Sequence, residues 1–324
     1  MLYPLKFRPL FFEKIWGGHK IEKLLGKNIG KLANCGESWE LSGISGKESE
    51  VADGLLAENS LSELVEIYMG DLVGEKVFDR YGNDFPLLVK FIDAQDNLSV
   101  QVHPDDKLAA KRYGTNGKTE MWYVLDADAG SGLYVGFKED VTKQQYLQAL
   151  ADGTVDSLLV FYPAKPGDEF FIPAGTVHTL GKGVMVAEIQ QSSEVTYRIF
   201  DWNRVGSDGK GRQLHTLEAE DALHFDDQTA YKVDYEKAVN KTVPMINCNQ
   251  FNVNLIEFDK TLEKVYAKID SFVIYVCLEG GANVIYEGEA QRLSKGEVML
   301  VPAIATELAM VPEGRTKLLE VYIG

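Results

Sequence analysis

The chain has 324 residues, of which 45% are hydrophobic, and a formal net charge of −16 at pH 7. This length and composition are typical of a globular protein with room for two domains, and they exclude a fibrous or disordered chain. The acidic balance argues against nucleic acid or an anionic membrane surface as a partner, because both need clustered Lys and Arg, although a single pocket can still be basic.

The N-terminal residues and the cysteines indicate a cytoplasmic protein. The start of the chain lacks the long apolar stretch of a signal peptide, and no run reaches the roughly 18 apolar residues of a membrane span. The three cysteines Cys35, Cys248 and Cys277 show no CxxC spacing, which disfavours a disulfide framework and a zinc ribbon. We therefore expect a reducing compartment.

The N-terminal part of the chain predicts strands and few helices. Short apolar runs alternate with glycine-rich breaks at the start, as in edge strands and turns. A capping box formed by Ser60 and Glu63 predicts a helix over residues 60–69. Residues 87–92 are apolar except for Lys90, which predicts a largely buried strand.

The next segment carries the first candidate site residues. Residues 98–103 alternate polar and apolar side chains with period two, so Ser99, Gln101 and His103 lie on one face of a strand. A proline and two aspartates then predict a short helix over residues 105–112.

Closely spaced strands dominate the rest of the chain. Glu120 opens a strand over residues 121–125, and a helix is expected over residues 142–150 and another over 217–223. Further strands are expected at residues 133–137, 158–162, 169–172, 184–189, 195–200, 253–258, 272–278, 283–286, 298–301 and 317–322. This density indicates a sandwich or barrel, and we place a domain boundary between residues 1–235 and 236–324.

A repeated pattern links the two expected domains. The first copy consists of Gly167, Pro173, Gly175 and His178. The second copy has Gly296, Pro302, Ile304 and Glu307 at the matching positions. The backbone signals thus persist while the histidine is lost, which predicts two related β units with a metal ion in the first only.

Four side chains could hold that metal ion. Gln101, His103, Glu120 and His178 supply two imidazoles, one carboxylate and one amide oxygen. A lone histidine in a strand is more often a core residue, but four such donors in one barrel would be costly to bury without a cation. The set has no thiolate and fits Zn²⁺, or Co²⁺, Mn²⁺ or Fe²⁺, with room for water or substrate. We expect one ion per chain.

The Gly167 to His178 pattern resembles the second motif of the cupin superfamily, a jelly-roll barrel that usually holds one metal ion. Residues 98–106, 118–120, 172–178 and 196–198, with 14–18 and 36–42, resemble type I mannose-6-phosphate isomerase in its short bacterial form. The resemblance implies a mainly β fold: a cupin jelly-roll barrel with a few decorating helices, followed by a second, smaller, metal-free cupin-like domain.

The resemblance also implies an activity and roles. Its members interconvert mannose 6-phosphate and fructose 6-phosphate, so the expected partner is a small sugar phosphate. It implies Gln101, His103, Glu120 and His178 as zinc ligands, Lys118 and Ser99 as substrate contacts, and Arg198 and Glu188 as catalytic residues. Glu188 is the candidate base, with a histidine or a bound water as the alternative. Arg198 would contact the enediolate or the phosphate.

Simpler interpretations remain at this stage. Without the resemblance, Glu188 could be a solvated strand residue and Arg198 could pair with Asp201 on the surface. An iron-dependent cupin oxygenase and a non-catalytic sugar-binding cupin are the rival functions. The sequence leaves the oligomeric state open.

Overall fold

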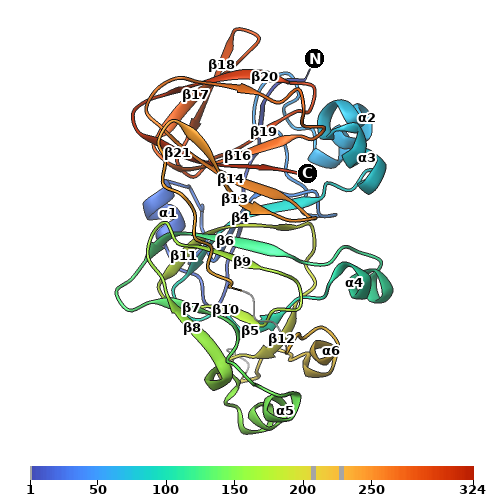
Figure 1. The fold of residues 1–324 in the computed structure, drawn as a ribbon, viewed down its shortest axis with the longest axis vertical. Helices are drawn as coiled ribbons and strands as arrows, with labels where there is room; N and C mark the ends of the chain where they lie inside the picture. The colour runs from blue at the N-terminus through green and yellow to red at the C-terminus, as the bar shows by residue number, and fades with distance from the viewer. Residues whose placement is uncertain (1, 206–208, 226–229) are drawn as a thin grey trace.

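The structure is a computed structural model that describes residues 2–205, 209–225 and 230–324. Over these residues the strands form four sheets, which are stacked as layers along the long axis of the molecule (Figure 1). Helices lie at the sides and at one end of the stack. The mainly β fold with few helices is confirmed, and no described helix is long and apolar enough to cross a membrane.

The first β unit consists of two facing sheets. The outer sheet has the order β12 (Tyr197–Phe200), β5 (Val100–Val102), β10 (His178–Leu180), β7 (Gly132–Phe137) and β8 (Leu159–Pro163). The inner sheet has the order β2 (Leu10–Phe12), β3 (Glu37–Leu41), β4 (Leu87–Ala94), β11 (Val184–Gln191), β6 (Glu120–Ala127) and β9 (Glu169–Ile172).

The second β unit also has two sheets. Its inner sheet has the order β1 (Leu5–Lys6), β19 (Val298–Val301), β16 (Val273–Glu279), β21 (Thr316–Tyr322), β14 (Asn252–Phe258) and β13 (Lys241–Asn247). Its outer sheet has the order β15 (Leu262–Val265), β20 (Glu307–Pro312), β17 (Gly281–Tyr286) and β18 (Glu289–Ser294). Strand β1 lies near the N-terminus, so the N-terminal segment of the chain contributes a strand to the second unit. The domain division at residue 235 stays a prediction.

The helices cover the edges of the layers. They are α1 (Lys20–Leu25), α2 (Leu61–Val73), α3 (Glu75–Tyr81), α4 (Asp106–Tyr113), α5 (Lys143–Asp152), α6 (Thr216–Glu220) and a short 3₁₀ turn, η1 (Val155–Leu158). The capping box of α2 is confirmed, since Ser60 Oγ accepts from Glu63 N at 3.2 Å. The predicted end at residue 69 coincides with a kink, since Met69 leaves helical geometry with φ of 46°, and a further helical segment continues to Val73. Helices α1 and α3 were not predicted.

Hydrophobic clusters fill the spaces between the layers. One cluster, which includes Trp122 and Phe170, lies inside the first β unit, and a larger one joins the two inner sheets. Strands β4 and β11 are sandwiched between these clusters, and every residue in both strands is buried. A charged side chain on β4 or β11 therefore needs a partner inside the protein.

The two copies of the repeat have the same backbone geometry. Gly167 and Gly296 have φ of 89° and 80°, a left-handed conformation that favours glycine, and each precedes a strand by two residues. The matching strands β9 and β19 each end at the residue before the proline of the repeat. His178 then opens β10 and Glu307 opens β20, so the two positions are structurally equivalent.

Glu169 on β9 is a buried carboxyl group outside the candidate site. Its side chain is fully buried, and neither carboxylate oxygen has a hydrogen-bond partner in the described part of the chain. Burial raises its pKa to about 8. The folded state therefore holds a proton that the unfolded chain releases near pH 4.5, and the stability contributed by this proton falls as pH rises from about 4.5 to about 8.

Glu169→Gln should therefore flatten the pH dependence of unfolding. At pH 8 the variant should be more stable than the wild type, by roughly 1–3 kcal/mol, whereas at pH 4.5 the two should differ little. Melting temperatures measured across this pH range test the prediction. Parallel curves for the two proteins would show that Glu169 ionises in the folded state as it does in the unfolded state.

Candidate metal centre and active-site pocket

Three ligand-type side chains meet inside the first β unit. His178 lies at the start of β10, Glu120 at the start of β6 on the facing sheet, and His103 directly after β5. Ligand atoms of all three lie within 4.8 Å of one another, and all three side chains are buried. His178 Nε2 is 3.1 Å from Glu120 Oε1, and His103 Nε2 is 3.6 Å from Glu120 Oε2.

Backbone carbonyls orient both imidazoles. His103 Nδ1 lies 2.9 Å from the carbonyl of Val195, and His178 Nδ1 lies 2.9 Å from the carbonyl of Thr176. A carbonyl can only accept, so each Nδ1 carries the proton and each Nε2 presents a lone pair toward Glu120. This is the arrangement in which protein histidines bind metal ions.

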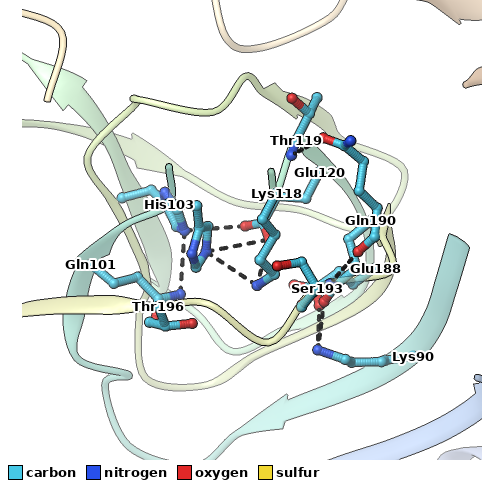
Figure 2. A network of polar contacts seen from close by, with 12 residues as sticks. Lys90, Gln101, His103, Lys118, Thr119, Glu120, Glu188, Gln190, Ser193 and Thr196 are labelled. Atoms are coloured by element: carbon cyan, nitrogen blue, oxygen red, sulfur yellow. Dashed lines mark hydrogen bonds and ion pairs between the residues drawn. The ribbon is translucent and has the colours of Figure 1, made fainter. Parts of the chain in front are cut away.

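Glu120 and Lys118 indicate a site built for a cation. Both oxygens of Glu120 lack a hydrogen bond of good geometry among the described residues. The Lys118 ammonium lies 2.9 Å from Glu120 Oε2 and 3.1 Å from His103 Nε2, which places a positive charge against two of the candidate ligands (Figure 2). The donor set therefore fits a divalent metal ion.

The electrostatics keep these donors in their metal-binding states. Burial raises the pKa of Glu120, but the positive charge of Lys118 and the interactions with the two histidines outweigh burial and hold that pKa well below its ordinary value. Burial, assisted by Lys118, holds the pKa of His103 well below its ordinary value. The carboxylate is thus ionised and the His103 imidazole neutral at physiological pH.

Gln101 and Ser99 lie beside this centre. The Gln101 side-chain nitrogen is 3.2 Å from His178 Nε2, and β5 and β10 pair directly at these two residues. The amide nitrogen and oxygen are nearly equal in shape, so an amide flip presents Oε1 to the same point. Ser99 is buried and lines the same pocket as Gln101.

A pocket of about 310 Å³ opens above the centre, and we call it the basic pocket. Gln101 and Lys118 connect it to the buried histidines, since both line the pocket and both contact a histidine. Five cationic side chains line it among the described residues: Lys14, Lys90, Lys118, Arg198 and Arg212. Its carboxylates are Glu37, Glu188 and Glu194. An acidic protein thus contains a locally basic pocket that suits a small anion.

Glu188 lies at the buried centre of β11 and lines the basic pocket. It is 2% exposed, so it is not the solvated strand residue of the simpler interpretation. Trp122 Nε1 donates to its Oε2 at 2.8 Å, and Lys90 Nζ lies 3.1 Å from its Oε1. Burial lowers the pKa of Lys90, but Glu188 and Glu37 outweigh it and raise that pKa, so Lys90 is a fixed cation against Glu188.

Arg198 on β12 also lines the basic pocket. It sits opposite Gln101 in the sheet register, its Nη1 donates to the carbonyl of Gln213 at 2.8 Å, and its Nε has no partner among the described residues. Asp201 binds Arg204 and Arg212 instead, at 2.6 Å and 2.8 Å. The surface pair of Arg198 with Asp201 that the simpler interpretation expected is therefore absent from the described contacts.

Comparison with known proteins agrees with this site. The type I phosphomannose isomerase catalytic-domain family model matches residues 5–130. Mannose-6-phosphate isomerase ManA from Bacillus subtilis is 34% identical over 302 residues, which cover 92% of this chain and 93% of that protein. The chain belongs to the type I mannose-6-phosphate isomerase family.

Other relatives extend this result. Mannose-6-phosphate isomerase from Streptococcus mutans is 39% identical over 227 residues, covering 69% of this chain and 68% of that protein. The crystal structure of the mannose 6-phosphate isomerase from Bacillus subtilis superposes with a TM-score of 0.89 at 31% identity, over 99% of this chain and 100% of that one. The cupin-type fold expected of a type I mannose-6-phosphate isomerase is thereby confirmed.

Several residues that line the basic pocket were not predicted as site residues from the sequence. Lys90 is the one charged residue in the apolar segment 87–92, and its burial there is the signal that could have identified it. Glu37 accepts from Trp39 Nε1 at 2.8 Å and lies 3.1 Å from Lys14 Nζ. Arg212 has no local signal, because only the folding of its loop brings it to the pocket.

Proposed function

We propose that this protein interconverts mannose 6-phosphate and fructose 6-phosphate, with one zinc ion held by Gln101, His103, Glu120 and His178. One observation carries the proposal. A buried centre combines two oriented imidazoles with a carboxylate that has no hydrogen bond of good geometry among the described residues, and the basic pocket adjoins this centre. Of the metals that suit this donor set, zinc is favoured by nitrogen and oxygen ligands with an open position.

The reaction moves one proton between C2 and C1 of the open-chain sugar through an enediol or enediolate. The pocket must therefore supply a base and stabilise a developing negative charge on oxygen. A bound metal ion would supply Lewis acidity toward the sugar oxygens. Side chains of the basic pocket would supply the base and the other contacts to the substrate.

Glu188 is the proposed base. Trp122 occupies its Oε2, whereas its Oε1 faces Lys90 and has no hydrogen bond of good geometry among the described residues. Oε1, which forms the ion pair with Lys90, is the oxygen that we propose accepts the proton from carbon. A histidine or a bound water is the alternative base.

Arg198, Lys118 and Ser99 are the proposed contacts to the substrate anion. A guanidinium stays charged and presents a planar fork of donors, which suits a phosphate or an enediolate. Arg198 Nε points to no protein partner among the described residues, so it remains for substrate. Lys118 joins the buried centre to the pocket and would hold a substrate oxygen near the metal ion.

We also propose that residues 1–235 carry the chemistry and that residues 236–324 form a metal-free unit. The second unit has no histidine, and among the described residues the only group of three or more metal-ligand side chains is the one in the first unit. We propose a cytoplasmic location, which agrees with three cysteines that are all unpaired.

A coupled assay of fructose 6-phosphate formation from mannose 6-phosphate tests the activity. We expect reversible turnover that needs no oxygen, which separates an isomerase from an iron-dependent oxygenase. Oxygen consumption with iron and no turnover of sugar phosphate would favour the oxygenase. Sugar-phosphate binding without turnover in the zinc-loaded protein would favour a non-catalytic binding protein.

A further inference from the structure

A second cleft, larger than the basic pocket, lies directly beside it. Its volume is about 520 Å³, and it is bounded by the loop after β3, the end of α4 and the segment after β11. Ser193 and Glu194 line both spaces, so they form a common wall between the cleft and the basic pocket.

The cleft differs from the basic pocket in its chemistry. Among the described residues, no Lys or Arg lines it, and its two charged side chains, Asp84 and Glu194, are both acidic. The C-terminal end of α4, at Gly114, adds backbone carbonyl groups that accept hydrogen bonds. Its hydroxyl and amide side chains are Ser45, Thr115, Asn116, Ser192 and Ser193.

Apolar groups form the rest of the cleft surface. Phe85 is almost fully buried, and Ile44 and Ala110 also line the cleft. Gly43 packs closely against Phe85, since a Cβ at position 43 would lie 2.7 Å from the Cβ of Phe85. The lining is thus mainly polar with a few apolar groups, a composition that suits a small polar molecule.

We propose that this cleft binds an uncharged, hydroxyl-rich molecule of hexose size, separately from the sugar phosphate in the basic pocket. The hydroxyl, amide and carboxylate groups match a ligand that both donates and accepts many hydrogen bonds. The two carboxylates and the lack of a lining cation exclude a phosphate. The inference does not rest on the proposed isomerase activity, because binding in the cleft needs no chemistry.

The common wall is held in place from several sides, so the two sites can be filled together. The Ser193 carbonyl accepts from Gln190 Nε2 at 2.8 Å. Two residues further along the chain, the Val195 carbonyl contacts His103 Nδ1. Glu194 forms an ion pair with Lys47, whose ammonium lies 5.1 Å from the centre of the Trp39 ring. These contacts hold the wall in place between the two spaces.

Calorimetric titration of the zinc-loaded protein with free mannose tests the proposal. The titration is done with the basic pocket saturated by 6-phosphogluconate, an unreactive sugar phosphate. We expect saturable mannose binding at millimolar concentration that 6-phosphogluconate does not displace. Mannose binding that is lost on saturation would place mannose in the basic pocket and overturn the inference, as would no binding of mannose at all. Failure of 6-phosphogluconate to bind would instead contradict the proposed function.

Two tryptophan substitutions on α4 locate the site. Ala110 lines the cleft and is exposed, so Ala110→Trp should fill the cleft and weaken mannose binding at least 10-fold while 6-phosphogluconate binding stays unchanged. Lys111→Trp is the matched control, since Lys111 is exposed on the same helix but does not line the cleft. Equal mannose affinity in the two variants would overturn the assignment.

Discussion

His178→Ala is expected to bring the metal content of the purified protein close to zero and to abolish turnover. The substitution removes one of the two oriented imidazoles, whose Nε2 lies 3.1 Å from Glu120 Oε1. The loss of activity should exceed the roughly 10–100-fold that follows when only a hydrogen-bonding partner of a metal ligand is changed. Elemental analysis and the coupled assay on the same sample measure both effects.

Glu307→Ala is the matched control for His178→Ala. Glu307 occupies the equivalent position in the second unit, at the start of β20, where it is exposed. This variant should keep one metal ion per chain and full activity. Two tightly held ions in the wild type, or an unchanged metal content in His178→Ala, would contradict both the site and the metal-free second unit.

Arg198→Lys should lower kcat by on the order of 100-fold while the metal content stays at one ion per chain. An ammonium is a point charge and cannot reproduce the planar fork with which a guanidinium meets a phosphate or an enediolate. Arg198 lines the basic pocket, and its Nε has no partner among the described residues, so its effect should appear in catalysis and not in metal binding.

Arg204→Lys provides the comparison for Arg198→Lys. Arg204 binds Asp201 at 2.6 Å and does not line the basic pocket. Its substitution should change kcat little. If Arg198→Lys kept near-normal kcat, or if both variants lost activity equally, Arg198 would have a structural role and the proposed contact to substrate would be wrong.

Much of the candidate site was predictable because its signals are local. Period-two alternation placed Ser99 and Gln101 on one strand face, and both line the basic pocket. The repeat placed His178 after a glycine turn and a proline, and the structure has these features in both units. The capping box of Ser60 and Glu63 likewise marked the start of α2 from adjacent residues.

The partners of these residues depend on sheet register, which sequence periodicity does not reveal. Glu188 meets Lys90 and Trp122 only because β11 pairs with β4 on one side and β6 on the other. The apolar segment 87–92 with its single lysine predicts a core strand, and only the neighbouring strands show that Lys90 faces the pocket. Helix α1 was missed for a related reason: it has few residues and only Ile21 is buried, so its periodic signal is weak.

Reconstitution of the metal-free protein with zinc tests the central claim most directly. After a chelator has removed the ion, turnover of mannose 6-phosphate is measured as zinc is added back in known amounts. The account predicts no activity without metal and a linear rise that ends at one zinc ion per chain, since the described residues contain one group of His103, Glu120 and His178. Full activity in the metal-free protein, or no activity at one bound zinc ion, would contradict it.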